Sequence, residues 1–136
     1  MYDPSTWDRI QTIDACKSSD DHRIHTLRVT SSGIALACCY NHCVHVLDHS
    51  GTLQKTHGTH GHTAGMFYKP FLCGVGNDGS MLLADCRNNR CQVFHNGEWH
   101  VPLLKPPPLV PRGVVVTEHT LYIITDDAEL VMYKIK

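Results

Sequence analysis

The residues best suited to metal chemistry in this chain are three closely spaced histidines. Eleven histidines occur among its 136 residues, and His57, His60 and His62 fall within one short segment that also holds two glycines. Neutral imidazole is a good ligand for zinc or copper. The glycines give the segment no rigid geometry, however, and no acidic residue lies close in sequence to orient the rings. We therefore expect a polar loop here and assign the chain no metal and no other cofactor.

The seven cysteines provide two more spacings that bear on metal binding, Cys39-x3-Cys43 and Cys86-x4-Cys91. A structural zinc site needs four converging ligands, and each pair here straddles an expected hairpin turn. We expect reduced thiols that fill small apolar positions. Because the sequence shows no signal peptide and no long apolar span, we expect a cytoplasmic protein with no membrane contact.

Catalytic motifs are absent from the sequence. It contains no Gly-x-Ser-x-Gly, no phosphate-binding loop and no His-Glu-x-x-His. Asp85, Asp126 and Asp127 occur where strands are expected to enter turns, and short carboxylates at such positions usually accept backbone N–H groups. We therefore expect no catalytic residue, no enzyme activity in this chain and no small-molecule substrate.

Short strands that recur along the chain must position these residues. Residues 34–47 and 81–94 align without a gap at a shift of 47 residues, and 121–133 is a looser copy. Each copy is an apolar strand, a polar turn with Asn or Asp, and a second apolar strand. Asn and Gly accept the positive φ of tight hairpins. A period of roughly 40 to 47 residues with several short strands is typical of a propeller blade.

The strand composition predicts how these sheets pack. Met81-Leu82-Leu83-Ala84 is apolar at every position, and Leu121-Tyr122-Ile123-Ile124 is similar. Strands with two apolar faces should be covered on both sides. We predict an all-β fold, a partial β-propeller of about three four-stranded antiparallel blades, and a two-sheet sandwich is the alternative. The expected units are 24–62, 63–104 and an incomplete 105–136, and 1–23 is an N-terminal segment that would add outer strands of a partial blade.

The second unit carries a run of specific motifs. They are Gly65-Met66-Phe67, Pro70, Gly79-Ser80-Met81-Leu82-Leu83-Ala84-Asp85 and Asn88-Asn89-Arg90-Cys91-Gln92-Val93-Phe94. Residues 63–97 thereby resemble an NHL repeat, the blade of the six-bladed NHL propellers, with Leu72 in place of a glycine and Cys91 in place of a valine. The flanking copies are weaker, since Cys43 stands where the arginine is expected in the first.

NHL propellers of this type are found at the carboxyl end of TRIM-NHL proteins. In that family a RING finger gives ubiquitin-ligase activity, and the propeller recognises protein or RNA targets. The resemblance therefore implies a non-catalytic binding module, here without RING, B-box or coiled coil. The alternative is a metal-dependent propeller enzyme of the amidating-lyase type, for which the His57–His62 loop would supply the ligands.

Connecting loops on a rigid scaffold are the expected site of partner binding. We predict a partner-binding rim made by Arg87, Asn88, Asn89 and Arg90, with Tyr40, Asn41 and His42 of the preceding unit. Replacing Arg87 and Arg90 with alanine should then weaken binding without changing the fold. The net charge of −1 gives little support to phosphate binding, yet protein and RNA targets both stay open.

Three blades do not close a ring, so two readings of the whole chain remain. Two half-rings would close one propeller by self-association around a two-fold axis. Alternatively, the chain is a fragment of a longer protein that contains the RING domain.

Overall fold

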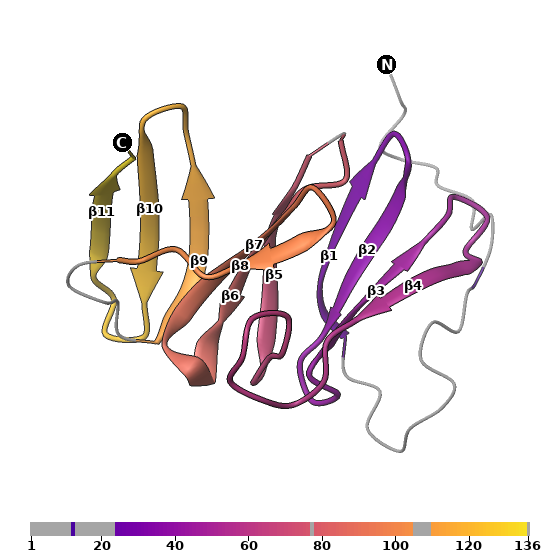
Figure 1. Cartoon of the computed structure of the whole chain (residues 1–136), viewed down its shortest axis with the longest axis horizontal. Coiled ribbons are helices and arrows are strands. Elements are labelled where there is room, and N and C mark those ends of the chain that lie inside the picture. The colour runs from indigo at the N-terminus through magenta and orange to yellow at the C-terminus, as the bar shows by residue number, and fades with distance from the viewer. Residues whose placement is uncertain (1–11, 13–23, 77, 105–109, 136) are drawn as a thin grey trace, which may run out of the picture.

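The computed structural model describes residues 12, 24–76, 78–104 and 110–135, and strands make up most of them. Three antiparallel sheets follow one another along the chain (Figure 1). The first holds β1 (Ile24–Thr30), β2 (Gly33–Cys38), β3 (Cys43–Leu47) and β4 (Leu53–His57). The second holds β5 (Pro70–Val75), β6 (Met81–Asp85), β7 (Arg90–His95) and β8 (Glu98–His100). The third holds β9 (Pro111–Val116), β10 (Thr120–Thr125) and β11 (Leu130–Lys134).

The predicted all-β fold is confirmed. Among the described residues the third sheet has three strands in the order β11-β10-β9, and it belongs to the unit that was expected to be incomplete. The expected N-terminal segment, 1–23, lies outside the described residues apart from the exposed Thr12. The described helical structure is the short 3-10 turn η1 (Cys86–Asn88), and no described helix could span a membrane.

Turn residues fit the conformations that the hairpins need. Asn89 follows η1 with φ of 52° and leads the chain into β7. Gly79 has φ of 83° in the β5–β6 hairpin, where the Asp78 carboxylate accepts the backbone N–H of Ser80 at 2.9 Å. Glycine and asparagine tolerate the left-handed region better than other residues. The sequence therefore supplies the right residue at each of these reversals.

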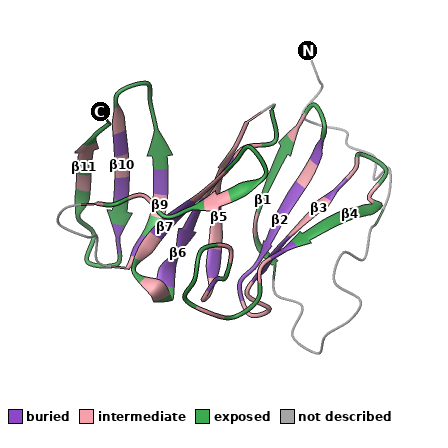
Figure 2. Cartoon of the chain, in the orientation of Figure 1, coloured by how far each residue is buried: buried purple, intermediate pink, exposed green. Residues whose placement is uncertain are grey.

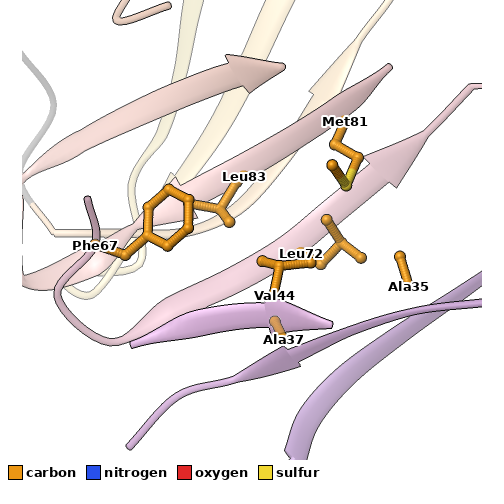
Figure 3. Packing of buried hydrophobic residues seen from close by; sticks show 7 residues of the cluster. All are labelled: Ala35, Ala37, Val44, Phe67, Leu72, Met81 and Leu83. Carbon is orange, nitrogen blue, oxygen red and sulfur yellow. The ribbon is translucent and has the colours of Figure 1, made fainter. Parts of the chain in front are cut away.

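The three sheets are stacked side by side, and apolar cores separate them (Figures 1 and 2). The first core joins the first and second sheets, and Figure 3 shows its buried residues Ala35, Ala37, Val44, Phe67, Leu72, Met81 and Leu83. The second core joins the second and third sheets through Ala84, Cys86, Cys91, Val114, Leu121 and Ile123. Full burial of one such Leu or Ile side chain stabilises the fold by about 1.5–3 kcal/mol.

Strand β6 contributes to both cores. Met81 and Leu83 face the first core, and Ala84 faces the second. This confirms the prediction that Met81-Leu82-Leu83-Ala84 is covered on both sides. The same prediction is wrong for β10 within the described residues, because Ile124 is 53 % exposed on the outer face of the third sheet. The neighbouring β11 exposes Met132 on that face.

Hydrogen bonds fix the first sheet against the second. The backbone N–H of Leu72 donates to Oγ1 of Thr26 at 2.8 Å. A β-bulge between Leu72 and Gly74 turns the carbonyl oxygen of Cys73 toward β1, and Nε of Arg28 donates to it at 3.3 Å. Polar contacts between strands that belong to different sheets set how the sheets align, since apolar packing alone is not directional.

Candidate binding rim

Three loops come together at one edge of the stacked sheets. They are the β2–β3 loop (39–42), the β4–β5 connection (58–69) and the β6–β7 loop (86–89), at the lower edge in Figure 1. The rings of His42 and Tyr68 are 5.4 Å apart, and the backbone N–H of Arg87 donates to the carbonyl oxygen of Tyr68 at 3.1 Å. We name the edge formed by residues 39–42, 58–69 and 86–89 the rim.

A buried carboxylate, Asp85, lies beneath the rim. Its residue is 0 % exposed, and its Oδ1 accepts the backbone N–H of Tyr68 at 2.7 Å. Its Oδ2 accepts side-chain N–H groups of Asn88, Arg90 and Gln92 at 2.8, 2.8 and 3.1 Å. A carboxylate is tolerated in the interior only when its oxygens are paired in this way. Through these contacts Asp85 holds the β4–β5 connection and the β6–β7 loop together.

The guanidinium of Arg90 extends this network to the β4–β5 connection. It donates to the carbonyl oxygens of His62, Thr63 and Met66. Gln92 donates to the Met66 carbonyl at 2.7 Å and accepts the backbone N–H of Gly65 at 2.9 Å. Five donors in a fixed planar array allow an arginine to bind a carboxylate and several carbonyls at once. Side chains of β7 therefore fix the path of residues 61–67.

Asn88 completes the clamp from the β6–β7 loop. Its Nδ2 donates to the carbonyl oxygen of Gly61 at 2.8 Å, and its Oδ1 lies 2.7 Å from Nδ1 of His62. Asn88 and Arg90, two residues predicted to contact a partner, thus have their polar groups engaged within the chain. We name Asp85, Asn88, Arg90 and Gln92 the clamp.

The other predicted rim residues surround the clamp. Arg87 and Asn89 are exposed, and Tyr40 and Asn41 are half-buried. The ammonium group of Lys69 lies over the Tyr40 ring, 4.9 Å from its centroid. A cation over an aromatic face is attracted by the ring quadrupole, and this contact joins the first loop to the connection.

A row of rings forms the centre of the rim. His60 lies 4.7 Å from His42 and 4.6 Å from Tyr68, measured between ring centroids. Nδ1 of His42 accepts the backbone N–H of Lys69 at 3.0 Å, so in the neutral ring Nε2 carries the proton. Burial lowers the pKa of His42, and the neighbouring His60 and Lys69 lower that pKa further. His42 therefore presents a neutral imidazole beside Tyr68 at neutral pH.

The histidines considered for metal binding do not converge on one point. His57 is 7 % exposed, and its Nδ1 accepts the indole N–H of Trp99 at 3.3 Å. Its ring also packs against Phe94, with centroids 4.7 Å apart. His60 and His62 lie on the rim, with ring centroids 6.3 Å apart. The structure thus assigns His57 to the packing between the first and second sheets and leaves the other two on the surface.

Within the described part of the chain, one group of potential metal ligands does converge. It consists of Cys38, Cys43 and His45, whose donor atoms all lie within 4.8 Å of one another. Reasoning from sequence missed it because spacing alone paired Cys43 with Cys39. Strand register was the signal that would have found it, since the last residue of β2 is the cross-strand partner of the first residue of β3.

Other thiols lie deep in the second core. Burial raises the pKa of both Cys86 and Cys91 to about 12. Thiolate is the nucleophilic form of cysteine, so these two residues are protonated and inert at neutral pH. The expectation of small buried fillers is met at these positions.

A cleft lies between the second and third sheets, away from the rim. Its volume is about 1110 Å³, and its lining includes Leu82, Cys91, Val93, Val114 and Leu121. Aliphatic side chains dominate this lining, and the polar groups that orient a small ligand are concentrated instead at the rim.

Neither the protein-family models nor the curated proteins compared with this chain give a match. The relationship to NHL repeats therefore stays a prediction that rests on the motifs of residues 63–97.

Proposed function

We propose that this chain is a non-catalytic binding module, a partial propeller whose rim recognises a protein target. The observation that carries the proposal is the clamp. Its hydrogen bonds, several of them buried, fix the β4–β5 connection at the surface. This connection presents His60 and Tyr68 beside His42. A loop held this firmly loses little entropy when a partner binds.

The composition of the rim suits a protein surface. Its exposed and half-buried side chains include two tyrosines, Tyr40 and Tyr68, and the arginine Arg87. Tyrosine and arginine are enriched among the residues that contribute most to protein–protein affinity. The neutral imidazole of His42 adds hydrogen-bonding capacity without the desolvation cost of a charge.

The charge at this edge disfavours RNA as the target. The basic groups at hand are Lys69 and Arg87, while Arg112 is paired with the carboxylate of Asp126. The β10–β11 turn also carries Asp127 and Glu129, both exposed. Binding to phosphates requires clustered, unpaired cations. A protein target is therefore the reading that the described residues favour.

The NHL resemblance extends the proposal to a biological role. The four clamp residues belong to the motif that carries the resemblance, which accounts for why these residue types occur together. In a protein of the TRIM-NHL type, such a module would hold the target for a ubiquitin ligase domain supplied elsewhere. This role is a proposal that follows from the resemblance and from the clamp.

Selection of peptides from a phage-displayed random library, with the purified chain as bait, tests the proposal. We expect a selected peptide, once synthesised, to bind in isothermal titration calorimetry about tenfold more weakly to Arg87→Ala and His60→Ala. His119→Ala is the matched control, because His119 is exposed in the β9–β10 turn at the opposite edge. Affinity should change little between low and moderate salt.

Two outcomes would contradict the proposal. One is a library that yields no peptide, or peptides that bind both rim variants as tightly as the unaltered chain. The other is tight binding of a single-stranded RNA oligonucleotide with an affinity that falls steeply as salt rises, which would replace the protein target by RNA.

A further inference from the structure

Cys38, Cys43 and His45 lie on one face of the first sheet. Cys38 and Cys43 are cross-strand partners at the β2–β3 turn. His45 is two residues further along β3, and side chains two apart in a strand point to the same face. Their strand neighbours Ala37 and Val44 belong to the first core. The two thiols and the imidazole therefore lie on the face turned away from the second sheet.

The donor atoms are already spaced for one metal ion. All three lie within 4.8 Å of one another, and Sγ of Cys43 is 3.7 Å from Nε2 of His45. In a tetrahedral zinc site, bond lengths of about 2.3 Å to sulfur and 2.0 Å to nitrogen place the ligand atoms about 3.5–3.8 Å apart. Closing the present arrangement around an ion therefore needs side-chain shifts of no more than about 1 Å.

A further hydrogen bond orients the imidazole. Nδ1 of His45 lies 2.8 Å from Oγ1 of Thr56, its cross-strand partner in β4. When Nδ1–H donates to this hydroxyl, Nε2 carries the lone pair and faces the thiols. Metal-binding histidines almost always have their second nitrogen held in this way. Thr56 thus provides the hydrogen bond that orients His45 for metal binding.

We propose that Cys38, Cys43 and His45 bind one zinc ion. Two thiolates and an imidazole favour a thiophilic d10 cation over magnesium or calcium, which prefer oxygen ligands. Three protein ligands leave a fourth position for water or an incoming group. Ligation replaces the two thiol protons, which pass to the solvent, and involves no redox step.

Zinc at this position would also stabilise one loop of the rim, but the zinc proposal does not depend on the proposed function. Cys38 and Cys43 bracket the loop 39–42, which presents Tyr40 and His42. A zinc ion bound to both Cys38 and Cys43 would join the two ends of this loop and so reduce its conformational freedom.

Metal titration of the reduced full chain tests the inference. The protein is treated with a strong chelator, freed of it, and titrated with zinc against a chromophoric competitor. Cobalt is then added as a spectroscopic probe. We expect one equivalent to bind, with the sulfur-to-cobalt charge-transfer band and the intense visible bands of a tetrahedral thiolate site.

Variants locate the ion. Cys43→Ser and His45→Gln should abolish stoichiometric binding, and Thr56→Val should weaken it about 10- to 100-fold through the outer contact. Cys73→Ser is the control thiol, and the double variant His60→Gln, His62→Gln is the control for the rim histidines. Thr56 is exposed, so its variant stays informative even where Cys43→Ser fails to fold.

Three results would overturn the inference. They are an absence of stoichiometric zinc binding by the reduced chain, binding that His45→Gln and Thr56→Val leave unaltered, and binding that is lost with the His60 and His62 changes instead. A Cys38–Cys43 disulfide that persists under reducing conditions would overturn it as well.

Discussion

Removal of the Arg90 side chain should destabilise the whole fold, although Arg90 lies at the start of β7, next to the rim. Its Nε pairs with Oδ2 of Asp85 at 2.8 Å, and the two side chains are 18 % and 0 % exposed. In Arg90→Ala the buried carboxylate loses its only cationic partner among the clamp residues. Taking one member from a buried ion pair costs about 3–5 kcal/mol.

The lower end of this range applies here. Asp85 keeps three donors, from Tyr68, Asn88 and Gln92. Water can reach the carbonyl oxygens that Arg90 leaves, since these contacts are at the exposed side. We therefore expect a loss of about 3 kcal/mol. With a urea m-value of about 2 kcal/mol/M, the unfolding midpoint should fall by about 1.5 M.

Arg87→Ala is the matched control, because Arg87 lies three residues earlier, in the β6–β7 loop. Arg87 is exposed, and surface substitutions usually change stability by less than about 0.5 kcal/mol. Arg90→Lys should fall between the two variants, because an ammonium group keeps the charge but not the planar array of donors. Urea unfolding followed by far-ultraviolet circular dichroism measures all three. Equal midpoints for Arg90→Ala and Arg87→Ala would refute a stabilising clamp.

Three further predictions follow from packing, titration and exposure. Gly58→Ala should destabilise the fold by more than about 1 kcal/mol, because Gly58 has φ of 86° and a Cβ there would lie 2.3 Å from the buried Phe67 ring; thermal unfolding that matches the unaltered chain would contradict this. Burial lowers the pKa of His57 in the folded chain, and Lys55 lowers it further. As the pH falls toward the ordinary histidine pKa of about 6.5, the unfolded chain therefore binds more protons than the folded chain does. The free energy of unfolding should then fall between about pH 7.5 and 5.5. His57→Gln should flatten this decline in the urea midpoint, and an unchanged slope would assign the decline to other groups. Finally, the exposed apolar face that includes Ile124 and Met132 should promote self-association, so light scattering should give a mass above 15.2 kDa that Met132→Lys lowers; a monomer at high concentration would contradict it.

The sequence predicted the strands and their turns well because both are local features. Asn88-Asn89 supplies the left-handed residue that the β6–β7 reversal needs, and the apolar run of β6 indicated two covered faces. The open face of β10 was beyond such reasoning. Ile124 is as apolar as Ile123, and only the arrangement of sheets decides which of them is buried.

Partner binding at the rim stays a prediction, and the structure shows contacts of two predicted rim residues that the sequence did not indicate. Asn88 and Arg90 were predicted to contact a partner because they are polar and lie next to an expected turn. A polar side chain at such a position can instead donate hydrogen bonds to backbone carbonyl oxygens of a distant segment, as both residues do here. The carbonyls that Arg90 binds lie 24 to 28 residues away in sequence. The Cys38–Cys43–His45 group was missed for a related reason, since register and not spacing brings two residues of neighbouring strands together.

Hydrogen–deuterium exchange of the chain with and without a library-selected peptide tests the central claim most directly. It locates the binding surface without any substitution in the protein. The account predicts protection in residues 39–42, 58–69 and 86–89, with the β9–β10 turn unchanged. Protection confined to the cleft between the second and third sheets, or to the opposite edge, would contradict a binding module that uses the rim.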